Sequence, residues 1–349
     1  MQVSMKPGYI QNPTNNKMKR ILYFGYYLKQ TDREKFFRFL NYAARESGKS
    51  KLLLLLDLVF STFRYNISLL DYFYFRFYNK PAGERRLWAG SGYMYEYHLI
   101  MNPKNSRDIL ENKIKFLDKY HEFVKRCHYT LPELKGNKSL GRELLSNASG
   151  KIVLKLSTGQ VGAEVKVYKS DQFTPETLIN EMERLGFDLA EEYVIQHQSL
   201  MEISPTGLNT LRVFTQLEGD EVVFLGARLR VSVNSPVDNM GAGNLAASVN
   251  METGVVDGPG VYSDITKSDE TVHPVTGISI VGFQVPFWKE ITAFVTQAAK
   301  HHPENKSIGW DIAITPSGPE LIEGNHNWCK LLWQLPVKRG LKPMISKYH

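Results

Sequence analysis

The sequence predicts an α+β protein in which a mainly helical front precedes a body of mixed strands and helices. Up to about residue 127, apolar residues recur at helical spacing and no alternation of strand and helix signals appears. Beyond residue 150, the chain changes to short runs rich in β-branched residues, separated by Gly, Pro and Asn. Groups of strands interrupted by helices are typical of α+β domains.

The front is predicted to hold several helices. The segment from Thr31 to Ser47 opens with a Thr-x-x-Glu capping box formed by Thr31 and Glu34. From Lys51 to about Tyr78 the chain is dense in Leu, Phe and Tyr, which predicts one or two well-buried helices. The spacing from Asn105 to Cys127 is again helical.

The body is predicted to contain a series of short strands, one long helix and a final pair of strands. The helix is expected from Phe287 to His301. The earlier strands are expected at Lys151 to Leu156, Glu164 to Tyr168, Tyr193 to Gln196, Asn209 to Leu217, and Glu221 to Val233.

Composition favours a globular protein of a reducing compartment. Hydrophobic residues make up 42% of the chain and charged residues 23%, which supplies a core. Two cysteines are too few for a disulfide framework or a thiolate zinc site. The first residues are polar, and the apolar run from Leu52 to Phe60 is too short to span a bilayer. We therefore expect a cytoplasmic protein.

The positive charge is concentrated in the front. Residues 1–150 hold 26 Lys and Arg against 13 Asp and Glu, whereas residues 151–349 hold 17 against 23. No zinc-finger, helix-turn-helix or RNP pattern accompanies these charges, so nucleic-acid binding is not expected. A solvated surface, attraction of an acidic sugar, and contact with the inner membrane leaflet all stay open. The basic residues concerned include Lys17, Lys19, Arg20, Lys29, Arg33 and Lys35.

The segment from Ser307 to Trp328 predicts a β-hairpin with acids on one face. Its alternating apolar runs flank Pro316-Ser317-Gly318, which suits a three-residue loop with Gly in the left-handed conformation. Such a loop pairs Ile314 with Glu320, Ile312 with Ile322, and Asp311 with Glu323, and it places Asn325 on the same face as the last pair.

Two carboxylates and an amide oxygen on one face suit Mg²⁺ with bound phosphate. Glu320 is expected on the opposite face, away from these groups. A solvent-facing hairpin whose acids maintain solubility is the alternative.

A lysine precedes a glycine-containing loop earlier in the chain. Lys155 lies near the end of a predicted strand, just before Ser157-Thr158-Gly159-Gln160-Val161-Gly162. An ammonium group and backbone N–H groups can together hold a polyphosphate. An ordinary hairpin with a nearby lysine is the alternative.

Together these motifs resemble the ATP-grasp superfamily, and within it the sugar-transfer-associated ATP-grasp proteins found beside bacterial surface-polysaccharide genes. The resemblance covers about residues 50–335 and implies two α+β lobes around a nucleotide. We accordingly expect a helical region at 1–104, a first lobe with the lysine and glycine loop at 105–190, and a second lobe with the hairpin at 191–349. The motifs are Asn209-Thr210-Leu211-Arg212, Ser235-Pro236-Val237-Asp238-Asn239, His273-Pro274 with Thr276-Gly277, and the hairpin segment.

The resemblance also implies a role for each candidate residue. Asp311, Glu323 and Asn325 would ligate magnesium. The nucleotide would be held at its phosphates by Lys113, Lys155, Gly159 and Gly162, and at its adenine by Glu192 and the backbone of Val194. A surface lysine at position 113 and a merely solvated acidic pair at 191–192 remain alternatives.

Arginines in two predicted strands form a further set. Arg212 lies mid-strand, and Arg228 and Arg230 share one face of the next strand, where isolated burial is costly without partners. Structural ion pairs are one explanation. The order of Arg212, Arg230 and Asn239 is also similar to that in ribosomal-protein glutamate ligases, although Gly241-Ala242-Gly243 replaces adjacent glycines. That likeness implies that both arginines stabilise an acylphosphate and a tetrahedral oxyanion.

The implied activity is that of an ATP-dependent carboxylate-amine ligase, with ATP and Mg²⁺ as cofactors. ATP would phosphorylate a carboxylate of an amino acid or a uronic-acid sugar, and an amine would then displace phosphate to give an amide. The product would belong to a cell-surface polysaccharide precursor or subunit. A kinase acting on a small-molecule hydroxyl and a non-catalytic nucleotide-binding partner of a glycan assembly complex are the alternatives.

Overall fold

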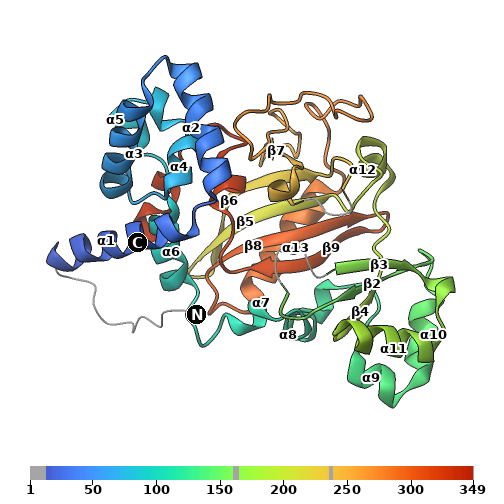
Figure 1. Cartoon of the computed structure of the whole chain (residues 1–349). Helices are drawn as coiled ribbons and strands as arrows, with labels where there is room; N and C mark the ends of the chain where they lie inside the picture. The colour runs from blue at the N-terminus through green and yellow to red at the C-terminus, as the bar shows by residue number, and fades with distance from the viewer. Residues whose placement is uncertain (1–12, 160–164, 236–238, 349) are drawn as a thin grey trace. The chain divides into compact units, whose positions relative to one another are not determined.

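The computed structural model describes residues 13–159, 165–235 and 239–348, with side chains from Met18 onward. Its helices and strands confirm the predicted α+β class and the mainly helical front (Figure 1). The contacts divide the chain into two compact units. Unit 1 comprises residues 1–97, 264–267 and 338–349, and unit 2 comprises residues 98–263 and 268–337.

Unit 1 is built from helices of the front and a short helical segment at the C-terminal end. Aromatic side chains such as Phe39, Tyr72 and Phe73 fill its interior. A helix that crosses the unit boundary, α6, joins it to unit 2. The helices are α1 (Pro13–Gln30), α2 (Arg33–Ser47), α3 (Lys51–Tyr65), α4 (Leu69–Tyr74), α5 (Ala82–Arg85), α6 (Ser91–Met101) and α15 (Lys342–Ile345), with 3-10 turns at Phe77–Asn79 and Ser346–Tyr348.

The predicted start of α2 is wrong by one residue. Asp32, not Thr31, is the N-cap, and its carboxylate accepts a hydrogen bond from the N–H of Lys35 at 3.0 Å. Thr31 instead donates its hydroxyl to the carbonyl of Tyr27 at 2.6 Å. Both residue types can cap a helix, so the sequence pattern alone did not choose between them.

The prediction that the segment after Lys51 is well buried is wrong for α3. This helix turns Ser61 and Thr62 inward together with Leu54 and Leu58, and exposes Leu52, Leu53 and Leu56, half of its leucines, to solvent. Its half-buried Asp57 accepts two hydrogen bonds from Arg85, at 2.6 and 2.9 Å, and a third from the hydroxyl of Tyr72 at 2.7 Å. Polar partners inside the unit therefore set the orientation of α3.

Unit 2 contains two antiparallel sheets. The small sheet has the strand order β1-β4-β2-β3, and its helices α9, α10 and α11 lie on one face, over a core that includes Ile152 and Leu154 (Figure 1). Its elements are β1 (His128–Thr130), α9 (Leu131–Gly136), α10 (Lys138–Leu145), β2 (Lys151–Lys155), β3 (Val165–Lys169), α11 (Pro175–Leu185) and β4 (Leu189–Glu192), with a 3-10 turn at Ser170–Gln172.

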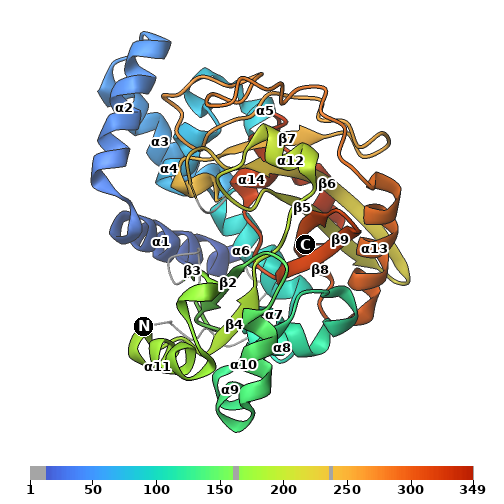
Figure 2. The ribbon, with the colours of Figure 1, turned by 90° about the vertical axis from the view of Figure 1, so that its right-hand side faces the viewer.

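The large sheet has the order β7-β6-β5-β8-β9. One face packs on α13 (Trp288–His301) through residues such as Val213, Leu229 and Ile312 (Figure 2). Because side chains alternate along each strand, Arg212, Arg230 and their neighbours point to the other face. The strands are β5 (Thr210–Glu218), β6 (Glu221–Val231), β7 (Leu245–Val249), β8 (Ser307–Thr315) and β9 (Gly318–Asn325).

The remaining helices of unit 2 connect or flank the sheets. They are α7 (Asp108–Glu111), α8 (Lys113–Lys119), α12 (Gln198–Ile203) and α14 (Lys330–Gln334), with 3-10 turns at His121–Phe123 and Met240–Ala242. The strand expected at Tyr193 to Gln196 is wrong, because β4 ends at Glu192. Across the part of the chain that the structure describes, none of the helices combines the length and apolarity needed to span a bilayer.

Candidate active site

The acidic hairpin forms, but its turn is shorter than predicted. Thr315 pairs with Gly318, so that Pro316 and Ser317 alone make the loop, and Gly318 has the expected positive φ of 110°. Ile314 therefore faces Pro319 rather than Glu320, and Ile312 faces Leu321 rather than Ile322. A register shift between Asp311 and Ile312 leaves Ile322 as the extra residue of a bulge.

The bulge restores the one pair on which the site depends. Beyond it, Asp311 faces Glu323 as predicted, and Gly309 faces Asn325. The short turn moves Glu320 opposite Ala313, two residues along β8 from Asp311 and hence on the same face. The prediction that Glu320 points away is wrong: the turn and the bulge together bring Glu320 and Glu323 to one side of β9.

Asp311 binds two arginines from the neighbouring strands. The Nε of Arg212 donates to one carboxylate oxygen, and its terminal nitrogen donates to the other at 2.8 Å. Arg230 lies 3.0 Å from the same second oxygen and also donates to the hydroxyl of Thr210. Burial alone would raise the pKa of Asp311, but the two guanidinium groups lower it to about 2. The structure thus brings together both predicted arginines and a predicted metal ligand.

These residues belong to a polar row that crosses all five strands of the large sheet. The strand registers align Ser248, Arg228, Arg212, Asp311 and Glu323 from β7 to β9. Arg228 donates to the carbonyls of Trp333 and Ala227, which fits a structural role. The row thus places positive side chains on β6 and β5 next to negative side chains on β8 and β9.

The carboxylate pair and the amide fit a divalent cation. Burial and the neighbouring charge of Asp311 raise the pKa of Glu323, so the pair is electrostatically strained without a cation. The amide nitrogen of Asn325 donates to Glu323 and to the carbonyl of Gly309, both at 3.3 Å, which fixes the amide beside the carboxylates. Each carboxylate oxygen has two lone pairs, so Asp311 can serve arginine and a cation together.

The set is too small to enclose a metal by itself. Over the described stretches of the chain, no group of three or more His, Cys, Asp and Glu side chains is arranged to hold an ion. Two carboxylates and an amide would leave coordination positions for phosphate oxygens and water, as is usual for Mg²⁺.

Lys155, at the end of β2, points to an acid that the sequence interpretation passed over. Its ammonium lies 2.7 Å from Glu191 on β4. Glu191 is buried, and although burial would raise its pKa, Arg126 and Lys155 lower it to about 2. Lys155 is thus paired with a buried carboxylate at the end of β2.

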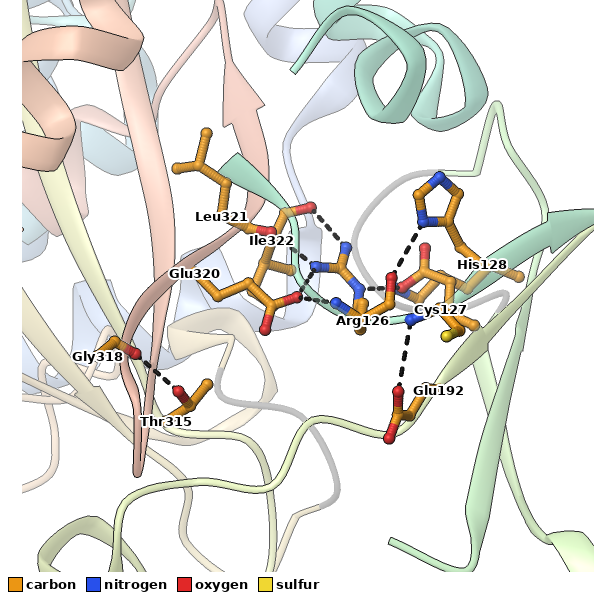
Figure 3. Close-up of polar contacts among 11 residues, drawn as sticks. Arg126, Cys127, His128, Glu192, Thr315, Gly318, Glu320, Leu321 and Ile322 are labelled. Carbon is orange, nitrogen blue, oxygen red and sulfur yellow. Dashed lines mark hydrogen bonds and ion pairs between the residues drawn. The ribbon is translucent and has the colours of Figure 1, made fainter. Parts of the chain in front are cut away.

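Arg126 joins the small sheet to the hairpin within unit 2 (Figure 3). Its Nε donates to Glu191 at 2.8 Å, and a terminal nitrogen donates to Glu320 at 2.8 Å. The same side chain donates to the carbonyl of Leu321 at 2.7 Å and to that of the bulge residue Ile322 at 3.4 Å. Arg126 therefore satisfies the backbone of the bulge that orients Glu323.

The start of the glycine loop is anchored by several side chains. Lys113 donates to the carbonyls of Leu156, at 3.2 Å, and Gly159. The N–H and hydroxyl of Ser157 donate to Asp188 at 2.6 and 2.5 Å. The structure therefore places Lys113 against the start of this loop, with its ammonium on two backbone carbonyls. Gly162 lies outside the described residues.

The other predicted nucleotide residues lie where different elements end. Glu192 is half-buried at the end of β4 and accepts the N–H of Cys127 at 3.4 Å, and Val194 is buried just beyond it. Asn239 uses its side chain locally, accepting the N–H of Gly241 at 2.9 Å before the 3-10 turn that precedes β7. Its neighbours 236–238 lie outside the described residues.

Three functional candidates were missed from the sequence: Arg126, Glu191 and Glu320. Arg126 stands just before Cys127 among residues that scan as helical, so no pattern marked it as buried. Glu191 was treated with Glu192 as one acidic pair, although only Glu191 faces Lys155. A charged residue on each side of an apolar strand was the available signal.

Comparison with known protein families finds a matching model over most of the chain. The model of the sugar-transfer associated ATP-grasp family matches residues 93–349. No curated protein sequence matches the chain.

Solved structures similar to the chain include D-alanyl-alanine synthetase A from Vibrio cholerae (12% identity, 67% of this chain and 60% of that one, TM-score 0.42). They also include biotin carboxylase from Campylobacter jejuni (12% identity, 69% and 48%, TM-score 0.41). A third is L-amino acid ligase from Bacillus licheniformis (12% identity, 70% and 50%, TM-score 0.38). The chain thus spans less than two thirds of the length of each.

Proposed function

Because the chain belongs to the sugar-transfer associated ATP-grasp family, we propose that it joins a carboxylate to an amine with the use of ATP. The observation that carries this proposal is the convergence of Asp311, Glu323 and Asn325 with Arg212 and Arg230 on the face of the large sheet opposite α13. Acidic and amide oxygens suit a metal nucleotide, and the arginines suit the anions formed in acyl transfer.

The nucleotide would be held by groups from both sheets of unit 2. Lys155 and Lys113, with Gly159 and Gly162, would contact its phosphates. Glu192 and the backbone of Val194 would contact the adenine, and Asn239 would complete the set. The support is that Lys155 is partly exposed at the end of β2, and that Lys113 already lies against the start of the glycine loop.

Asp311, Glu323 and Asn325 would hold Mg²⁺. When bound, the metal would neutralise charge on the phosphates of ATP. The protein's own contribution is to fix the three donors on adjacent strands through the bulge at Ile322 and its contact with Arg126.

Arg212 and Arg230 would stabilise the acylphosphate and the oxyanion that forms when the amine attacks. The phosphoryl group would pass from ATP to a carboxylate, and the amine would then displace phosphate and lose a proton to give the amide. Burial would lower the pKa of Arg212, but Asp311 raises it, so this guanidinium keeps its charge throughout. Arg230 is the more exposed of the two, at 12% against 6%, and is the better placed to meet a substrate.

The carboxylate would come from an amino acid or a uronic-acid sugar, and the product would be a cell-surface polysaccharide precursor or subunit. We place the protein in the cytoplasm, with unit 1 in contact with the inner membrane leaflet. The excess of Lys and Arg in residues 1–150 supports that contact.

The experiment is an acceptor panel. Release of ADP is measured with Mg²⁺ and ATP while amino acids and uronic-acid sugars are offered in pairs, and each product is weighed by mass spectrometry. A ligase gives ADP, phosphate and an amide. A product that keeps the γ-phosphate without an amide would identify a kinase. No ADP with any pair, together with tight binding of ATP, would favour a non-catalytic nucleotide-binding protein. Arg230→Lys should slow amide formation, because an ammonium does not replace a planar guanidinium, and Arg228→Lys, which alters the structural arginine of the same row, is its matched control.

A further inference from the structure

Two helices of unit 1 expose apolar side chains to solvent. We define the α1–α3 apolar face as Met18, Ile21, Leu22, Tyr26 and Leu28 of α1 with Leu52, Leu53, Leu56, Val59 and Phe60 of α3. Their exposed fractions run from 40% to 67%. A gathering of large exposed apolar side chains on a globular protein usually marks an interaction site.

Each of the two helices exposes an apolar face to solvent. On α1 the buried residues are Tyr23 and Tyr27, and the exposed apolar residues occupy the opposite arc at helical spacing. On α3 the inward residues include Ser61 and Thr62, whereas the leucines at 52, 53 and 56 point outward. Folding of unit 1 alone does not explain five large apolar side chains on the solvent side of α3.

The two helical faces adjoin each other. Arg20 of α1 donates to the carbonyl of Phe63 on α3 at 2.6 Å. The ring of Phe24 lies 5.1 Å from that of Phe63, which is half-buried between the exposed leucines and α1. These contacts fix α1 beside the C-terminal end of α3, so the exposed apolar side chains lie on two adjacent helices.

Basic side chains border this surface. Lys49, Lys51 and Arg64 are exposed at the two ends of α3, and Lys29 is exposed on α1 among the apolar residues. Unit 1 as a whole holds 21 Lys and Arg against 8 Asp and Glu, whereas unit 2 holds 22 against 28. The entire positive excess of the chain therefore lies in the unit that carries the apolar face.

We propose that the α1–α3 apolar face binds the surface of an anionic lipid bilayer, with α1 and α3 lying in the interface. Apolar side chains would enter the acyl boundary while the bordering lysines and arginines contact phosphate headgroups, the combination by which amphipathic helices hold to membranes. The charge complementarity selects an anionic lipid over an apolar protein surface, which would not need the basic border. The proposal deepens the inner-leaflet contact proposed above.

The test is flotation of the full-length protein with vesicles, in the absence of nucleotide. The vesicles contain phosphatidylcholine alone or with phosphatidylglycerol, and each is used at low and at high salt. We expect binding to the anionic vesicles at low salt and much weaker binding to the neutral ones. High salt should weaken but not abolish binding, since the apolar contact does not depend on charge.

Two double variants distinguish binding through the α1–α3 apolar face from nonspecific hydrophobic binding. Leu56→Ser with Phe60→Ser should reduce the partition into anionic vesicles by about tenfold or more. Both residues are about 60% exposed, so the fold should tolerate the change, which a circular dichroism melt checks. Val275→Ser with Ile278→Ser removes exposed apolar residues of unit 2 and should leave partition unchanged.

Equal partition of wild type and the α3 variant, or no partition of wild type, would overturn the proposal. Loss of a dimer in the α3 variant by ultracentrifugation, without vesicle binding by wild type, would also overturn it and identify a second copy as the occupant. Because the assay uses neither ATP nor an acceptor, failure of the ligase proposal would not alter its outcome.

Discussion

Replacing Arg126 by Met tests whether one buried guanidinium maintains the link between the small sheet and the hairpin. The change keeps a long apolar stem but removes hydrogen bonds to Glu191, Glu320 and two carbonyls of β9. Lys155 still pairs with Glu191, so Glu320 is the carboxylate left without its cation. We expect both stability and catalytic geometry to suffer.

The magnitude follows from two independent estimates. Removal of one partner from a buried ion pair costs about 3–5 kcal/mol of unfolding free energy. The pKa of Glu191 is lowered from 4.5 to about 2, which corresponds to about 3 kcal/mol shared between Arg126 and Lys155. A loss of about 3 kcal/mol or more is therefore the expected result at neutral pH.

The pH dependence has a definite sign. A lowered carboxyl pKa in the folded state stabilises the protein above pH 4.5, and that stabilisation is lost as the pH falls from 4.5 to about 2. Without Arg126, burial acts on Glu191 with less opposition, so its pKa rises and the loss on acidification begins at a higher pH. Denaturant unfolding between pH 3 and 8, followed by tryptophan fluorescence, measures both effects. Four of the five tryptophans, at 288, 310, 328 and 333, lie in unit 2 and report on it.

Two controls make the result decisive. Adding Glu320→Gln to Arg126→Met should recover part of the lost stability, because it removes the stranded charge. Arg184→Met breaks an ion pair with Glu181 on the surface of α11, and should leave the denaturant midpoint nearly unchanged. If Arg126→Met unfolded at the same denaturant concentration as wild type at every pH, the network would carry no stability and our reasoning would fail.

Three further substitutions probe the site. Glu323→Gln should reduce turnover by about 100-fold or more and weaken binding of Mg-ATP, because a ligand charge is lost. Glu218→Gln, an exposed change on β5, should do neither. Wild-type turnover in Glu323→Gln would refute the metal assignment. Lys155→Ala should weaken ATP binding by about tenfold in calorimetry, and Lys155→Arg should restore binding poorly, since a planar guanidinium does not replace a compact ammonium. Lys169→Ala, at an exposed lysine, is the control. Equal ATP affinity of wild type and Lys155→Ala would contradict the phosphate-binding role. Glu320→Gln should lower the unfolding free energy by about 1–3 kcal/mol, because the carboxylate that accepts two hydrogen bonds from Arg126 is lost; a melt identical to wild type would argue against its placement.

The sequence predicted the fold class and the central acid pair, because both follow from local patterns. Alternating apolar runs define β8 and β9, and the opposition of Asp311 and Glu323 survives two compensating departures from the predicted register. The turn is one residue shorter and the bulge adds one residue, so their effects cancel at this pair. Between them, at Glu320, they do not cancel, and the side chain changes face.

The predictions that are wrong share a physical cause: contacts with residues far away in the sequence determine the local structure. A bulge needs backbone partners, and Arg126, which supplies them, lies almost 200 residues away from Ile322 in the chain. In α3, the contacts of Asp57 with Arg85 and Tyr72 turn the polar side inward against the hydrophobic pattern. Neither contact leaves a periodic trace in the sequence.

The polar row across the large sheet also determines when the site can come into existence during synthesis. Arg212 and Asp311 are adjacent in the sheet but 99 residues apart in the chain. Until β8 and β9 leave the ribosome, β5 and β6 present Arg212 directly opposite Arg228, two cations of the same sign without the acid that neutralises Arg212. The hairpin therefore completes the large sheet, and a nascent chain that stops before residue 325 has neither the complete sheet nor the full set of carboxylate and amide side chains of the candidate site.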